Sequence, residues 1–257
     1  SSLSIAGNVS IAAWVYFDDF NNGLAHVAGK YSSGSKGYVI EKSANENKLS
    51  FWVGDGSDDI EVRTGTLSAT TWYHVVGTND GTNSKIYVNG ALANTVSQGS
   101  PAASTDNFKI GMNPINLGSE RYWKGDIDEV AVWNDALTAA EISTLYNSGS
   151  GIDAGTNGGG YRSKDELVAY WKFNEGSGTS LLDQTSNDND GTISGATYAS
   201  RTNTVNYSSG DGTNTLTFNY TVADGHDNSD LDYSSTSALT LNGGAIVDPA
   251  GNASTLT

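Results

Sequence analysis

Apolar and polar residues alternate along most of this chain with a period of two, which is typical of β-strands that bury one face. In the segment 9–17 the alternate apolar residues begin at Val9, and Trp14 and Tyr16 lie on the opposite face. Further strands are expected at residues 37–41, 48–53, 72–78, 85–88, 108–112, 126–133 and 167–173. Asn89-Gly90 directly follows one of these segments and predicts a type I′ hairpin turn. Short strands at this spacing predict an antiparallel β-sandwich.

One segment has the periodicity of a helix. Thr138 and Glu141 have the spacing of a capping box, and apolar residues follow at Ile142, Leu145 and Tyr146. Gly149 is the predicted end of this helix. The sequence therefore predicts a single short helix among the strands.

Residues 148–160 are rich in glycine, and two interpretations are open for them. They resemble a flexible linker between domains in composition. However, Tyr170, Trp171 and Phe173 follow soon after and need a core in which to be buried. This favours a long connection within one domain that extends over residues 1–200.

Composition and charge narrow the classes of function. The chain has 257 residues, of which 13 are Lys or Arg and 29 are Asp or Glu, giving a net charge of −16. Such a surface repels nucleic acids and anionic membranes, and its carboxylates are suited to divalent cations. With no cysteine, the chain has no disulfides, thiolate metal sites or cysteine nucleophiles. No apolar run approaches the ~20 residues of a membrane-spanning helix. The chain opens without a signal segment, so we expect it to be part of a longer protein.

The order and spacing of several segments resemble the laminin-G-like jelly-roll domains of the concanavalin A-like superfamily, which are common in bacterial surface and secreted proteins. The matching segments are residues 9–15, 71–76, 85–90, 123–130, 134–142 and 167–176, with Asp183 and Gly191. The resemblance implies an all-β fold, an antiparallel jelly-roll sandwich with one short helix. The segment 170–173 usually opens such a domain, and here we expect it to complete a sheet from the C-terminal side.

Residues 201–257 are predicted to form a separate, incomplete β unit. The segments 204–210, 216–222, 230–233 and 248–252 resemble the second half of the Ig-like (cadherin-like) repeats of bacterial adhesins. Without the first half, one sheet edge would be unpaired. Either the jelly roll covers that edge, or another copy lends strands and builds dimers or fibres.

The resemblance also implies a calcium site. Its ligands would be a carboxylate before the helix and the Asp/Asn-rich loop, which correspond here to Asp128, Asp183, Asn187 and Asn189. Calcium takes six to eight oxygen ligands, which such a loop can present. The alternative is an ordinary solvated turn. Weaker acidic candidates lie further along, at Asp224, Asp227, Asp230, Asp232 and Asp248.

Aromatic side chains are the candidates for sugar binding, because a flat apolar ring can stack on a pyranose face. Trp123, with Tyr122 and Arg121, lies beside a Gly/Asn-rich loop and is the first choice; Trp52 with Tyr31 is the second. Core packing is the alternative for each. The remaining tryptophans considered match core positions of the family: Trp14, Trp72, Trp133 and Trp171.

Catalysis is not expected. The retaining glycosidases of this fold carry a Glu-x-Asp-x-x-Glu strand. The most similar segment, residues 126–131, has no glutamate at either of the two Glu positions of that motif. His26, His74 and His226 are far apart, and neither a nucleophile elbow nor a phosphate loop is present.

The sequence thus predicts a non-catalytic, calcium-stabilised adhesion or glycan-recognition module of a bacterial extracellular protein. Its partner would be a glycan or another cell-surface ligand. The alternative is a structural spacer or filament subunit that self-associates by strand sharing through residues 201–257.

Overall fold

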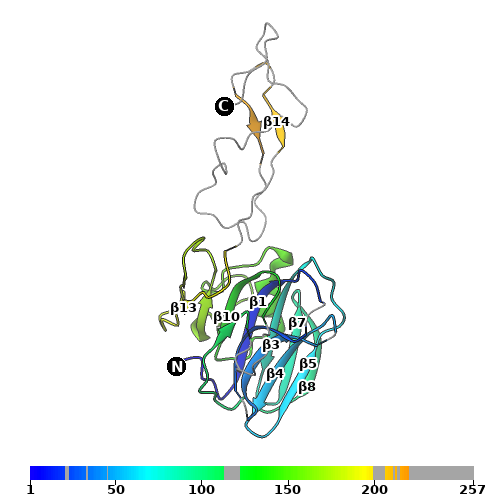
Figure 1. Cartoon of the computed structure of the whole chain (residues 1–257), viewed down its shortest axis with the longest axis vertical. Helices are drawn as coiled ribbons and strands as arrows, with labels where there is room; N and C mark the ends of the chain where they lie inside the picture. The colour runs from blue at the N-terminus through cyan, green and yellow to red at the C-terminus, as the bar shows by residue number, and fades with distance from the viewer. Residues whose placement is uncertain are drawn as a thin grey trace. The chain divides into compact units, whose positions relative to one another are not determined.

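The computed structural model describes residues 1–20, 23–32, 34–44, 46–112, 122–198, 206–210, 212 and 215–219. By its internal contacts the chain divides into two units, Ser1–Tyr198 and Ala199–Thr257. The first unit holds two large antiparallel sheets, a two-stranded one and one short α-helix, which confirms the predicted sandwich (Figure 1). No helix in the described part of the chain is both long enough and apolar enough to cross a bilayer.

One sheet has six strands. Their order is β11 (Leu167–Trp171), β10 (Ile127–Trp133), β1 (Val9–Tyr16), β6 (Trp72–Asn79), β7 (Asn83–Val88) and β8 (Ala91–Ser97). Strand β11 pairs with β10 at the edge of this sheet, so the 170–173 segment does complete the sheet from the C-terminal side. Both Asn89 and Gly90 have positive φ, 49° and 77°, as the predicted type I′ turn between β7 and β8 requires.

The second sheet has five strands. Their order is β5 (Asp59–Arg63), β4 (Leu49–Asp55), β3 (Lys36–Lys42), β2 (Ala25–Ser32) and β9 (Lys109–Ile110). Neighbouring strands β3 and β4 are visible side by side in Figure 1. Because side chains alternate across a strand, Tyr38 and Ile40 of β3 and Phe51 of β4 all point into the sandwich.

The main core lies between the two sheets. Val9, Ile11, Ala13 and Val15 of β1 are fully buried there, as their alternation predicts. They pack with the inward residues of β3 and β4 in one continuous apolar cluster. The inner face of each sheet is therefore buried in this core. Residues available to a ligand must lie on the two outer faces.

The outer face of the six-stranded sheet is covered by helix α1 (Ala139–Tyr146) and the loop that follows it. Thr138 is the N-cap and forms the predicted capping box with Glu141. The helix ends at Asn147, which has the left-handed conformation, while Gly149 ends a short 3₁₀ turn (Asn147–Gly149). Beneath this cover a second apolar cluster contains sheet residues, helix residues and loop residues: Ala12, Val76, Tyr87, Ala131, Trp133, Leu137, Ile142, Leu145, Ala154 and Tyr161.

The glycine-rich stretch belongs to the first unit. Ala154 is buried against the second apolar cluster, and Gly158 pairs with Tyr161. A 3₁₀ turn (Ser163–Glu166) then leads into β11, and two short strands, β12 (Ser180–Leu181) and β13 (Gly191–Thr192), pair with each other. Of the two interpretations, the long connection within one domain is the one observed.

In the second unit the described residues include one antiparallel pair, β14 (Tyr207–Ser209) and β15 (Thr217–Phe218). Most of the residues on which the Ig-like resemblance rests lie outside the described part of the chain. The Ig-like assignment and the strand-sharing partner therefore stay predictions, as do the weaker acidic metal candidates.

Candidate functional site

The outer face of the five-stranded sheet is polar and aromatic, and strand pairing arranges its residues in three rows. The registers across β2, β3, β4 and β5 give the rows His26–Glu41–Ser50–Arg63, Gly29–Val39–Trp52–Glu61 and Tyr31–Gly37–Gly54–Asp59. We call the side chains of His26, Tyr31, Glu41, Trp52, Asp59, Glu61 and Arg63 the polar face. Their alternate neighbours fill the core, so the polar face is the outward half of the same period-two pattern.

Nothing comparable to helix α1 covers this side. Among the described residues, β2, β3, β4 and β5 contact one another, β9 and strands of the opposite sheet, and no helix contacts them extensively. At one end the chain between β2 and β3 folds back over the sheet. A Cβ on Gly54 would lie 2.2 Å from the carbonyl carbon of Ser35, so only glycine permits this close approach.

The first row contains a buried contact between a histidine and a glutamate. His26 Nε2 lies 2.8 Å from Glu41 Oε2, and the two residues are 4% and 5% exposed. Despite the short distance, neither ring nitrogen of His26 has a partner with hydrogen-bond geometry. A buried polar atom without a hydrogen-bond partner lowers the stability of the folded state. In a purely structural pair we would expect these hydrogen bonds to be made.

Glu61 is held by its neighbours on both sides. The hydroxyl of Ser50 donates to Glu61 Oε1, and Arg63 Nη2 lies 2.5 Å from Glu61 Oε2. Arg63 also contacts Glu46, at 3.2 Å. The hydrogen bond to Glu61, with the charges of nearby glutamates, raises the pKa of Arg63 further above its usual value. The guanidinium is therefore fixed beside the carboxylates, and it is already paired.

Trp52 stands at the centre of the polar face, between Val39 and Glu61 in the second row. Its side chain is partly exposed, yet its indole Nε1 is buried and has no hydrogen-bond partner. In the third row Tyr31 donates its hydroxyl to Asp59 Oδ2. Burial, reinforced by the Asp59 carboxylate, raises the pKa of Tyr31, so this phenol stays a proton donor at neutral pH.

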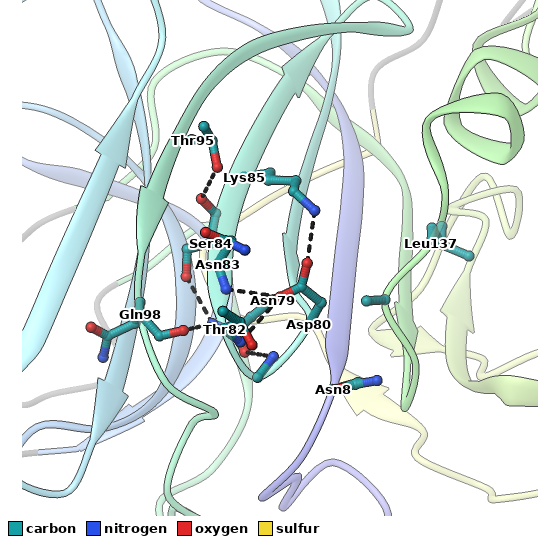
Figure 2. Close-up of polar contacts among 12 residues, drawn as sticks. Asn8, Asn79, Asp80, Thr82, Asn83, Ser84, Lys85, Thr95, Gln98 and Leu137 are labelled. Atoms are coloured by element: carbon teal, nitrogen blue, oxygen red, sulfur yellow. Dashed lines mark hydrogen bonds and ion pairs between the residues drawn. The ribbon is translucent and has the colours of Figure 1, made fainter.

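A second polar cluster, at the turn between β6 and β7, is arranged differently. Figure 2 shows the Asn79 amide donating to Ser84 Oγ (2.9 Å) and to the carbonyl of Gln98 (3.3 Å). Asp80 accepts from two backbone N–H groups of the turn and from Lys85 Nζ, at 2.7 Å. The hydrogen bond from Lys85 lowers the pKa of Asp80. Both side chains are used to close the turn, which makes this cluster structural.

The structure brings three of the four expected calcium ligands together. Asp183 Oδ1 accepts from the backbone N–H of Tyr170 (2.9 Å) and of Thr185 (3.0 Å). Asp183 Oδ2 accepts from the Thr185 hydroxyl and from the backbone and side-chain amides of Asn189, at 2.9 to 3.0 Å. The Asn187 amide donates to a β11 carbonyl, at 3.1 Å. Asp183 therefore fixes the loop to the edge of the sheet with five hydrogen bonds.

Asp128 lies elsewhere. It belongs to β10, opposite Trp14, and accepts from the backbone N–H of Glu129 at 3.0 Å. Asp183 pairs with Trp171, so β11 lies between the two aspartates. Within the described ranges no three His, Asp or Glu side chains form a group that could hold a metal. As arranged, these donors do not fit calcium, and the expected site stays an untested prediction.

The aromatic platform expected at residues 121–123 is split. Trp123 packs on Phe17, with ring centroids 4.6 Å apart, and its indole N–H donates to the carbonyls of Tyr16 and Asp126. Its placement agrees with the core-packing alternative. Tyr122 is 52% exposed. Arg121 lies outside the described residues, so a binding role for this group is not tested.

A groove of about 800 Å³ lies beside α1, between the β7–β8 turn and the loop 152–160. Its longer polar side chains already have partners: Asn147 donates to the carbonyl of Gly151, and Asp153 contacts Lys172 at 2.8 Å. The polar face differs from this groove because some of its donors and acceptors are unused.

Comparison with known proteins agrees with this architecture. A laminin-G family model, described as the concanavalin A-like lectin/glucanases superfamily, matches residues 1–143, which is more than half of the chain. The chain belongs to this superfamily. Strand β11, which completes the six-stranded sheet, lies beyond the matched residues. No curated protein is significantly similar to the chain in sequence.

Several solved structures are similar to part of the chain. A candidate carbohydrate-binding protein from Bacteroides ovatus is 22% identical with a TM-score of 0.58, over 74% of this chain and 52% of that protein. The present chain thus spans about half of that relative. Domain 4 of an extracellular arabinanase from Geobacillus stearothermophilus, in complex with arabinotriose, is 20% identical with a TM-score of 0.45, over 55% of this chain and 68% of that one. A pentraxin from Limulus polyphemus is 16% identical, with a TM-score of 0.43, over 54% and 69%.

Only part of the polar face was predicted from the sequence. Trp52 and Tyr31 were expected as candidates, but His26, Glu41, Glu61 and Arg63 were not. The sequence does hold a signal for two of them, because residues 59–63 read Asp-Ile-Glu-Val-Arg, a strict alternation of charged and apolar side chains. The registers that unite these residues come only with the folded sheet.

Proposed function

We propose that this chain is a non-catalytic glycan-recognition module and that the polar face is its binding surface. The sequence-based context, a bacterial extracellular protein that adheres to glycans or cell surfaces, is part of the proposal. Membership of the concanavalin A-like lectin/glucanase superfamily supports it at the level of the fold. Calcium is left out because the expected ligands do not fit it as arranged.

The observation that carries the proposal is the combination around Trp52. A partly exposed indole whose N–H has no partner lies beside Glu61, and Glu41 and Asp59 lie in the neighbouring rows. Sugars present flat apolar faces bordered by hydroxyl groups. An aromatic ring can stack on such a face while carboxylates accept from the hydroxyls.

The accessible side chains of the polar face are Tyr31, Trp52, Asp59, Glu61 and Arg63, whereas His26 and Glu41 are buried. We expect accessible side chains spread over neighbouring strands to suit an extended chain rather than a small enclosed ligand. With few side chains per sugar unit, we expect the affinity of one module to be weak, and repeated modules to raise it through effective concentration. This matches a role in adhesion to polysaccharides or glycan-coated surfaces.

Affinity electrophoresis in gels that contain single polysaccharides tests the proposal. We expect the wild-type chain to be retarded by at least one polysaccharide and Trp52→Ala to lose the retardation. Trp72→Ala, which removes another partly exposed tryptophan, from the opposite sheet, is the matched control and should behave like wild type. Isothermal titration with oligosaccharides of the retarding polymer then gives the affinity.

Two results would contradict the proposal. If Tyr122→Ala abolishes retardation while Trp52→Ala does not, the binding surface is the platform at residues 121–123 and not the polar face. If the chain releases reducing ends from its ligand, and Glu61→Gln stops that release, the chain is a glycosidase and the non-catalytic part is wrong. Absence of retardation by every polysaccharide tested would count against glycan recognition.

A further inference from the structure

Carboxylates outnumber cations on the outer face of the five-stranded sheet. Glu41, Asp59 and Glu61 supply three carboxylates, against Arg63 of β5 and Lys109 of β9, which lies opposite Gly29 in the second row. Arg63 is already engaged by Glu61 and by Glu46 at the rim. The whole chain has a net charge of −16, so no distant positive field compensates. A ligand that carries carboxylates or sulfates would meet net repulsion on this face, where Arg63 is engaged and Lys109 lies at the opposite edge of the sheet.

Two carboxylates of the polar face hold acceptor oxygens that are not used. One oxygen of Glu41 contacts His26, and one oxygen of Asp59 accepts from Tyr31. The second oxygen of each carboxylate receives no hydrogen bond from a described residue. An acceptor needs a donor, and hydroxyl groups are the donors that a glycan provides.

Resting on the proposed function, we infer that the polar face takes an uncharged glycan, whose hydroxyl groups donate to the exposed Asp59 carboxylate and one of whose oxygens accepts from Trp52. Uronate-rich, sulfated and sialylated glycans would be disfavoured by the net negative charge of this face. The ligand class follows from which atoms are unused and from the charge around them.

Trp52 supplies an unused donor that carries no charge. Its Nε1 is buried without a partner in this structure, and a buried donor is costly when unpaired. A ligand oxygen that reaches the indole N–H, after a small movement of the side chain, would remove that cost. An unpaired buried donor lowers the stability of the free protein, and a ligand that pairs with it restores that stability.

Paired polysaccharides that differ only in charge test the inference. Polygalacturonate is compared with its fully methyl-esterified form, and carboxymethyl cellulose with hydroxyethyl cellulose, by affinity electrophoresis and titration in low salt. We expect the uncharged member of a pair to bind at least tenfold more tightly. Asp59→Asn removes a charge at a residue that contacts the glycan, and it should reduce the ratio of the two affinities severalfold.

The variant Trp52→Phe tests the role of the indole N–H. It keeps an aromatic ring for stacking and removes the donor. We expect about a fivefold loss of affinity for the uncharged glycan, the factor that corresponds to one hydrogen bond, together with an unchanged or raised Tm. Wild-type affinity in Trp52→Phe would overturn the assigned role of Trp52.

The outcomes separate the inference from the proposed function. If the anionic member of a pair binds more tightly and Trp52→Ala abolishes that binding, the uncharged-ligand inference is wrong and the glycan-recognition function stands. If neither member of any pair binds, nor any other polysaccharide, the function itself fails.

Discussion

The two sheets of the jelly roll share one core but present opposite chemistries on their outer faces. On the six-stranded sheet, Val76, Tyr87 and Trp133 lie beneath α1 and its following loop, and the cover is apolar. On the five-stranded sheet, the equivalent outward positions hold Trp52 with charged residues, and no described helix lies over them. Because outward apolar residues need a cover and outward charged residues resist one, the strand sequences themselves decide which face is available for a ligand.

The two sheets also differ in the surroundings of their histidines, His74 and His26. His74 of β6 stacks with Trp14 and Tyr146, at centroid distances of 5.2 and 6.2 Å, with no charged group among these ring contacts. Complete burial lowers its pKa to about 4, so it is a neutral packing residue. His26, on the other sheet, is equally buried but lies against the Glu41 carboxylate. One histidine serves packing, and the other belongs to a charged cluster whose hydrogen bonds are incomplete.

Incomplete satisfaction is informative because folded proteins avoid it. The turn at Asn79 and Asp80 shows how fully this chain can pair its polar groups when they serve structure. Among the described residues, three of the four buried side-chain atoms without a partner belong to His26 and Trp52 of the polar face, and the fourth is Nδ1 of His74 on the covered face. Unpartnered atoms are expected where a ligand completes the pairing.

The comparison predicts that tryptophan removal has opposite consequences on the two faces. Trp133 is 1% exposed and donates to the Tyr161 hydroxyl at 2.9 Å, so Trp133→Ala should lower the free energy of unfolding by about 3–5 kcal/mol. Trp52→Ala should cost no more than about 1–2 kcal/mol while it abolishes glycan binding. Urea denaturation of both variants, beside the binding assay, checks this. Equal losses of stability would mean that the polar face is a covered face as well.

Acidification should weaken the covered face through His74. Its pKa is about 4 in the folded chain and near 6.5 when unfolded, so between these values the unfolded state binds more protons. Stability is therefore complete above about pH 6.5 and falls as the pH drops towards 4, by up to about 3 kcal/mol. His74→Phe should remove this part of the pH dependence. If the urea midpoints of wild type and His74→Phe change in parallel from pH 7 to 4.5, the assignment is wrong.

Much of the fold was predictable because its signals are local. The alternation in β1 and β6, the Thr138–Glu141 capping box and the Asn89-Gly90 turn each depend on residues close in sequence. Strand β2 was not predicted, because a bulge between His26 and Ala28 interrupts its alternation. Strands β5 and β8 were also missed. Edge strands carry more exposed and charged residues, which weakens the apolar pattern.

The candidate site was only partly predictable. Trp52 and Tyr31 could be predicted because an aromatic residue is a candidate for sugar stacking whatever its neighbours are. Glu41 and Glu61 become neighbours of Trp52 only through the registers of β3, β4 and β5, which no local pattern specifies. For the same reason the burial of Trp123 could not be predicted, because it packs against Phe17, which is far away in the sequence.

A smaller effect is expected where the β7–β8 turn meets the helix that covers the six-stranded sheet. Gly90 has φ 77°, and an added Cβ would lie 3.0 Å from the Tyr146 ring. Gly90→Ala should therefore cost about 1–2 kcal/mol, measured by urea denaturation, through strain in the turn and displacement of α1. Gly65→Ala is the matched control, because its Cβ would meet nothing within 4 Å, and it should stay within about 0.5 kcal/mol of wild type. Indistinguishable variants would show that the helix does not depend on this contact.

The smallest expected effect is that of calcium. Both oxygens of Asp183 already accept hydrogen bonds, so a calcium ion would have to displace donors that fix the loop to β11. We therefore expect the Tm in excess calcium and in EDTA to agree within about 1 °C, with Asp183→Asn lowering both equally. Calcium at 100 times its Kd would add about 2.7 kcal/mol to the stability of the folded state, which in a domain of this size is a shift of several degrees. A shift of that size, lost in Asp183→Asn, would establish the predicted metal site and show that the loop rearranges to bind calcium.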